Sequence, residues 1–171
     1  MLSLATWTMA IAMALGTAAK PLDTTALLES PKRHVRATDE SMRRLLKSGH
    51  QRSPTFTALL KRLELSDVIV YVQAVDRLPG ALEGRTVVLP PTHGVRYVRI
   101  QIALRGTPND SIAVLGHELR HAVEVADAPD VIDTAGLAAL YRRIGIDRGN
   151  NEFDTVAAQE TGRRVAKELA A

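Results

Sequence analysis

The chain has 171 residues, which is enough for one domain and too few for two of ordinary size. Hydrophobic residues make up 46% of the chain and charged residues 24%, a balance typical of a globular protein with a buried core. The formal charge of +3 is mildly basic, and no block of basic residues accompanies it, so we predict no nucleic-acid partner. The absence of cysteine excludes disulfides, cysteine nucleophiles and a lipoprotein anchor, and it limits any metal site to His, Asp and Glu.

The first 19 residues contain no charged side chain and end in small residues before Lys20 and Pro21. This pattern is similar to a secretory signal peptide cleaved near Ala18 or Ala19, although the usual preceding basic residue is absent. The alternative is a membrane anchor, because about 18 apolar residues nearly span a bilayer. We therefore expect export to the periplasm or the extracellular space, with no stable membrane contact unless residues 1–19 are retained.

The next part of the chain changes from irregular to helical. Residues 20–37 carry two prolines and mixed charge, which is typical of a linker leading into one domain over 38–171. We expect a first helix over 38–47 that ends at Gly49, and a second helix after Ser53 and Pro54.

Residues 67–105 favour strands. The stretch 67–75 is rich in β-branched residues and alternates, and 86–89 is a short apolar run before two prolines. The stretch 95–105 alternates between an apolar and a polar face. These three segments predict a small, mostly antiparallel sheet with one face in water.

Helical spacing returns after a turn at 106–110. Helices are expected over 111–126, 131–144 and 152–169. The order of helices, strands and helices predicts an α+β domain, in which a small sheet is followed by two functionally important helices.

Two histidines and a glutamate lie in one turn of the expected helix over 111–126, in the order His117, Glu118 and His121. The two imidazoles are displaced by about 40° around the helix axis and about 6 Å along it, so they can hold one tetrahedral metal ion. Glu118 lies one step around the helix, where it can reach a metal-bound water more easily than the metal. The helix is otherwise apolar nearly all round, so these polar groups need buried partners, and a metal supplies them.

The segment 116–126, Gly-His-Glu-Leu-Arg-His-Ala-Val-Glu-Val-Ala, resembles the active-site helix of the zincin metallopeptidases. The resemblance implies one Zn²⁺ per chain, a peptide or protein substrate, and peptide-bond hydrolysis with Glu118 as general base. It also implies a substrate-side edge strand upstream of the helix, a role that fits 95–105. The alternative is a non-catalytic zinc-binding interaction domain that retains the zincin fold.

A catalytic zinc takes three protein ligands, and the third ligand is not in the motif itself. Metzincins place it in the pattern His-Glu-x-x-His-x-x-Gly-x-x-His, where this chain has Glu124 and Asp127 in the last two positions. Because no glycine turns the chain back, the continuing helix carries Asp127 about 15 Å from His117 along the axis. We therefore reject Asp127.

Gluzincins take the third ligand from a later helix, which leaves Glu152, Asp154 and Glu160 as candidates. If residues 152–169 are helical, Asp154 is the one acid on the buried stripe, whereas Glu160 lies about 240° away and Glu152 about 160° away. We therefore favour Asp154, with Glu160 as the weaker choice. The competing role for Asp154 is to stabilise the helix N-terminus, with Asn150 or Asn151 as the cap.

An oxyanion-stabilising residue is not evident. His93, Tyr97 and Tyr141 are of suitable types. A loop position explains His93 better, and packing with a wet hydroxyl explains both tyrosines better, so we assign none. Arg120 and Glu124 fit a helix surface or a position behind a ligand histidine.

Overall fold

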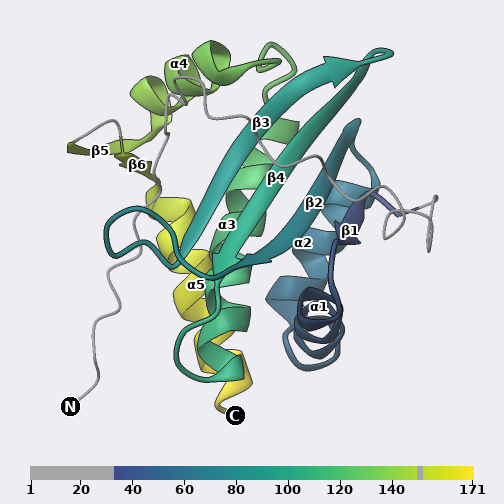
Figure 1. Cartoon of the computed structure of the whole chain (residues 1–171), viewed down its shortest axis with the longest axis vertical. Helices are drawn as coiled ribbons and strands as arrows, with labels where there is room; N and C mark the ends of the chain where they lie inside the picture. Colours follow the sequence, from purple (N-terminus) through teal and green to yellow (C-terminus); the bar gives the residue numbers. More distant parts are fainter. Residues whose placement is uncertain (1–32, 150–151) are drawn as a thin grey trace.

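A computed structural model describes residues 33–149 and 152–171 of the chain (Figure 1). The predicted signal peptide or anchor at 1–19 lies outside the described residues, as does most of the predicted linker. The described elements, in chain order, are β1 (Val35–Ala37), α1 (Glu40–Arg52), α2 (Pro54–Glu64), β2 (Val68–Val75), β3 (Gly84–Thr92), β4 (Val95–Ala103), α3 (Pro108–Ala126), α4 (Thr134–Ile144), β5 (Ile146–Gly149), β6 (Glu152–Asp154) and α5 (Val156–Leu169). This is the expected mixture of helices with a small sheet, and none of these helices is long and apolar enough to cross a bilayer.

Four strands form one sheet in the order β1–β2–β4–β3. β1 pairs with β2 and β2 pairs with β4 in parallel, whereas only β3 and β4 are antiparallel. The expectation of a mostly antiparallel sheet is therefore wrong. Helices α1 and α2 form a crossover between β1 and β2. The segment 76–83 connects the end of β2 to the start of β3 at the same end of the sheet and leaves room for one strand between them. β3 then runs back, and β4 returns in this position in the direction of β2.

β1 lies at the end of the segment predicted to be a linker. Its three residues are too few to show a period, and its pairing with Val70–Val72 of β2 is a long-range contact. The strand extends the sheet by one, so the domain begins before residue 38.

One face of the sheet carries the core, as the alternation in 95–105 predicted. The inward residues of the two central strands are fully buried, and helices α1, α2 and α3 contribute side chains to the same cluster (Figure 1). Burial of each such large aliphatic side chain stabilises the fold by about 1.5–3 kcal/mol. The inward strand residues are Val68, Val70, Val72, Val98, Ile100 and Ile102.

Gly49 does not end the first helix, contrary to the prediction. α1 continues to Arg52. Gly49 instead allows close packing: the helix lies directly on the ring of Phe56, where a Cβ on residue 49 would be 3.0 Å from three ring carbons. The end comes at Ser53, which closes α1 and also caps α2 by accepting a hydrogen bond from the Phe56 amide. One serine thus fixes the corner between the two helices.

Candidate metal centre

Helix α3 carries the two histidines into the core. Thr107 and Asp110 form a capping box at its start, and Pro108 occupies the first turn, where its missing N–H costs nothing. Gly116 lets α5 approach closely, since a Cβ there would lie 2.9 Å from Cγ2 of Val165. α3 is therefore held between the sheet and α5, and nearly all its residues from Ser111 to Val125 are buried.

Asp154 enters the site from a strand and not from a helix. The expected helix over 152–169 is wrong at its start, because residues 152–154 form β6, in which Asp154 pairs with Ile146 of β5. α5 begins at Val156, and its cap is Thr155, where the sequence had suggested Asn150 or Asn151. Asp154 is fully buried all the same, because it stands at the entrance to the helix that packs against α3.

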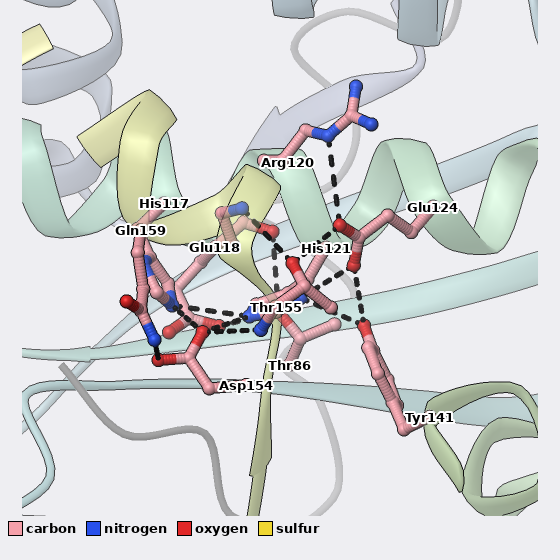
Figure 2. A network of polar contacts seen from close by, with 11 residues as sticks. Thr86, His117, Glu118, Arg120, His121, Glu124, Tyr141, Asp154, Thr155 and Gln159 are labelled. Atoms are coloured by element: carbon pink, nitrogen blue, oxygen red, sulfur yellow. Dashed lines mark hydrogen bonds and ion pairs between the residues drawn. The ribbon is translucent and has the colours of Figure 1, made fainter. Parts of the chain in front are cut away.

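His117, His121 and Asp154 form a buried group that could hold a metal ion. Their donor atoms make a nearly regular triangle: Nε2 of His117 lies 3.2 Å from Nε2 of His121 and 3.4 Å from Oδ1 of Asp154, and the third side measures 3.6 Å (Figure 2). Ligands of a tetrahedral ion at 2.0–2.1 Å are separated by about 3.3–3.4 Å. The side chains are thus already spaced as the ligands of one small cation.

Burial and the close contacts within the triangle shift the pKa of all three side chains. Burial and the nearby charge of His121 lower the pKa of His117 to about 3. Burial alone would lower the pKa of His121 as well, but hydrogen bonds with Asp154 and Glu124 outweigh it and raise that pKa to about 9. Burial would raise the pKa of Asp154, and its bond to His121 and the charge of His117 reverse the direction. The protonation of each side chain therefore depends strongly on the other two.

Glu124 lies next to His121, on the side away from the triangle, and contacts residues of α3, of α4 and of the N-cap of α5 (Figure 2). Its Oε2 accepts a hydrogen bond from Nδ1 of His121 at 2.8 Å, and its Oε1 accepts one from the hydroxyl of Thr155 at 2.7 Å. The hydroxyl of Tyr141 lies 3.4 Å from the same carboxylate and 3.0 Å from Nδ1 of His121. A carboxylate on the second nitrogen of a ligand histidine orients the ring and increases its basicity.

Asp154 is also held from behind. Gln159 donates to its Oδ2 at 2.8 Å, and the amide of Thr155 donates to its Oδ1 at 2.7 Å. The Thr155 hydroxyl, which donates to Glu124, also accepts from the amide of Ala158 and so caps α5. The start of α5 and the second nitrogen of His121 are therefore both tied to Glu124.

Glu118 points toward strand β3, unlike Glu124, which bonds to His121. Its Oε2 accepts a hydrogen bond from the Thr86 hydroxyl at 2.7 Å, and its carboxylate lies against Gly84. Burial raises the pKa of Glu118 to about 7, although His121 and the Thr86 hydroxyl lower it. A divalent cation in the triangle would lower it further.

The rejected and weaker ligand candidates lie elsewhere. Asp127 ends α3 and forms a salt bridge with Arg62. Glu160 is exposed on α5, and the side chain of Glu152 is outside the described part of the structure. Among the acids weighed for the third position whose side chains are described, only Asp154 lies with the two histidines.

The residues weighed for an oxyanion role are dispersed. Tyr97 stacks on Tyr71 in the sheet, and His93 lies in the β3–β4 turn with a φ of 52°. Tyr141 is fully buried, so the wet hydroxyl expected from the sequence is wrong: the hydroxyl bonds to the histidine network. Arg120 lies 3.7 Å from Glu124.

Sequence reasoning missed Gly84, Thr86, Thr155 and Gln159. Thr86 and Gly84 meet Glu118 only because the hairpin lies across α3, a contact that no local pattern encodes. Thr155 carried a usable signal, since threonine is one of the residues preferred at a helix N-cap, whereas Gln159 carried none. Assigning the helix start to 152 hid that signal.

Comparison with known proteins adds no identification. The chain matches no protein-family model, and neither the curated proteins nor the solved structures give a match. The site must therefore be judged on its own geometry.

Proposed function

We propose that this chain is a zinc-dependent hydrolase of the metallopeptidase class, in which His117, His121 and Asp154 hold Zn²⁺ and Glu118 is the general base. The observation that carries the proposal is the donor triangle, whose sides of 3.2, 3.4 and 3.6 Å suit a tetrahedral ion. Two imidazoles and one carboxylate are typical zinc ligands, and three protein ligands leave a fourth position for chemistry. The bond from Glu124 to His121 is the support that such ligands usually have.

Zn²⁺ in this triangle would supply Lewis acidity, the property that acidifies water and polarises a carbonyl in hydrolytic metal sites. The chain's own contribution is Glu118. The Thr86 hydroxyl holds the carboxylate through Oε2, and this carboxylate would take a proton from the attacking water and then return it to the leaving amine. Thr86 thus fixes the carboxylate in one orientation.

Strand β3 provides the place for an extended peptide. The role suggested for 95–105 passes to β3, because β4 is hydrogen-bonded on both sides, to β2 and to β3. In the described part of the chain, β3 pairs only with β4, so its other edge offers backbone donors and acceptors beside Thr86 and Glu118.

The second candidate function is a structural metal site in a binding domain. Burial favours it: His117, His121, Asp154 and Glu118 are all no more than 2% exposed, and a substrate must reach a catalytic metal. The two functions share the ligands and differ in Glu118, which has no role in a closed structural site.

Metal content and hydrolysis separate these functions. Elemental analysis of the purified chain should give about one zinc per molecule, and it would also detect iron(II), which uses a similar donor set. Glu118→Gln should keep the metal and lose hydrolysis of a casein or peptide-library substrate by at least about a hundredfold. A metal content near zero refutes the site, whereas unchanged activity in Glu118→Gln refutes the mechanism.

The ligand assignment has its own matched pair of variants. Asp154→Asn should lower zinc affinity strongly, since it removes a charged donor, whereas Glu160→Gln changes an exposed acid on the following helix, α5. Equal losses of affinity in the two variants would contradict the role of Asp154.

A further inference from the structure

The outer face of the sheet, opposite the core, has an unusual composition. Residues that share a register also share a face, so Val87, Arg99, Tyr71 and Arg36 form one row across all four strands. The adjacent row contains Arg85, Gln101 and Gln73. None of the four strands contains an acidic residue, and the two rows include three arginines, Arg36, Arg85 and Arg99.

Arg85 and Arg99 are the centre of this face. Arg85 donates to Oε1 of Gln101 from Nε at 3.2 Å and from Nη2 at 2.5 Å, which are contacts with a neutral group. Nε of Arg99 is buried and has no hydrogen-bond partner among the described residues. Burial and the charge of Arg99 lower the pKa of Arg85, so the two guanidinium groups repel each other across the strands. An anion placed between them would relieve the repulsion and supply the missing acceptor.

Aromatic and apolar side chains surround the arginine pair. The rings of Tyr71 and Tyr97 stack with centroids 6.2 Å apart, and the guanidinium of Arg36 lies 5.8 Å from the Tyr71 centroid. Val87 and Leu89 complete the same face and are only partly buried. Arginine and tyrosine on a partly apolar surface are the residue types that dominate protein–protein interfaces.

The outer face and the candidate metal centre lie on opposite sides of the same part of the sheet. In Figure 1 the helices α2, α3 and α5 lie behind the sheet, on the face that carries the core. Gly84 and Thr86 contact Glu118 on the inner side of β3, and Arg85, between them, points to the outer side. A polypeptide at the edge of β3 could therefore place side chains against both.

We propose that the outer face of the sheet, centred on Arg85 and Arg99, binds an acidic segment of a polypeptide. Planar guanidinium groups bind carboxylates in a bidentate manner, and the flanking tyrosines and aliphatic side chains suit the apolar residues of an extended peptide. A nucleic acid fits less well, because the face has three arginines, no lysine and an apolar margin, whereas polyanion sites make many phosphate contacts. The binding does not depend on hydrolysis, but if the proposed function holds, acidic polypeptides are the substrate class.

The direct test is binding of a fluorescent 15-residue peptide in which Glu alternates with Leu and Tyr, with the same peptide carrying Gln as the neutral control. The full chain should bind the Glu peptide at least tenfold more tightly than the Gln peptide, and salt should weaken the binding. Arg85→Gln and Arg99→Gln should each weaken it by about tenfold. Arg163→Gln, an equal charge change at an exposed position of α5, should leave it unchanged.

Several results would overturn the proposal. Equal binding of the two peptides, or an equal loss in Arg163→Gln, would show that no acidic site exists on this face. Tighter binding of a single-stranded DNA of matched length would assign the face to nucleic acid, and self-association abolished by Arg99→Gln would assign it to a second copy. If Arg99→Gln fails to fold, Arg99→Lys, which keeps the charge and loses the planar fork, must show a reduced affinity. Metal content and hydrolysis are measured separately, so failure here leaves the proposed function standing.

Discussion

Gly84 of β3 and Glu118 of α3 are in such close contact that a Cβ on residue 84 would lie 2.5 Å from Oε1 and 2.7 Å from Cγ of the glutamate. No real Cβ fits there, so glycine is what allows the carboxylate to lie against the strand. The next inward residue of β3, Thr86, donates the hydrogen bond that fixes the carboxylate's direction. One short piece of an edge strand therefore determines where the carboxylate of Glu118 lies.

Replacement of Gly84 by alanine should force β3 or Glu118 to move. We expect a loss of about 1–3 kcal/mol in the free energy of unfolding, which is typical of overpacking, and an unchanged metal content because Glu118 is not a ligand. Urea denaturation measures the first and elemental analysis the second. In a Glu118→Ala background the same substitution should cost far less, since the clashing carboxylate is gone. A cost that is the same in both backgrounds would contradict the contact.

Glu124→Gln should weaken zinc binding about 10–100-fold without removing a ligand. The reason is that Glu124 orients His121 through Nδ1 and also holds Thr155, the residue after Asp154. Competition with a chromogenic chelator gives the affinity. Glu160→Gln is the control, because it removes the same charge from an exposed position. If both variants bind zinc like the parent chain, Glu124 does not position the ligands.

The local patterns of the sequence predicted much of the candidate site. The spacing of His117 and His121 is meaningful as soon as the segment is helical, because the helix alone fixes the direction of both rings. The structure indeed places both on α3 and brings Asp154 to them. The reason given for Asp154, a place on the buried stripe of a helix, was nevertheless wrong. The residue lies in β6 and is buried because it directly precedes the start of α5.

The arrangement of the strands could not be predicted in the same way. Alternation shows which face of a strand is buried, but it carries no information on the direction of the neighbouring strand. The parallel pairing of β2 with β4 depends on the route of the segment 76–83, and β1 is too short to show a period. The prediction that 95–105 is an edge strand was therefore wrong, because β4 is internal and the edges of the sheet are β1 and β3.

Glu168 provides a pH-dependent link between the last helix and the corner at Ser53. Its carboxylate accepts hydrogen bonds from the Ser53 hydroxyl and from the amide and hydroxyl of Thr55, the last two at 3.1 and 2.6 Å. Partial burial would raise its pKa, but these bonds outweigh it and lower the pKa below the usual 4.5. The stabilisation is therefore complete above the unfolded pKa and is lost as the pH falls through the folded pKa.

Glu168→Gln should accordingly destabilise the chain at pH 7, by about 1–2 kcal/mol, because it weakens hydrogen bonds to a charged acceptor. The deficit should start to shrink as the pH falls below about 4.5, where Glu168 of the unfolded chain becomes protonated, and it should vanish once the pH is below the lowered pKa of the folded parent chain. Urea denaturation of both chains between pH 7 and pH 3 measures the difference. A deficit that stays constant over this range would show that the charge of Glu168 contributes nothing.

Arg96 anchors the far end of the helix that carries the donor triangle. Its side chain is 6% exposed, and Nη1 donates to the carbonyls of Val125 and Ala128 at 2.9 and 2.8 Å, where α3 ends. The last carbonyls of a helix have no partner within it, and a cation there also interacts favourably with the negative end of the helix dipole. Its Nε and Nη2 donate hydrogen bonds to the two carboxylate oxygens of Asp67, whose side chain is 60% exposed.

The two halves of this interaction should have unequal effects on stability. Arg96→Ala leaves buried carbonyls without donors and should cost about 2–4 kcal/mol, and Arg96→Lys should cost less because one cation remains. Asp67→Asn should cost under about 1 kcal/mol, since the pair with an exposed carboxylate is screened by water. Urea denaturation of the three variants gives the order. If Asp67→Asn is as damaging as Arg96→Ala, the ion pair and not the carbonyl cap holds α3 to the sheet.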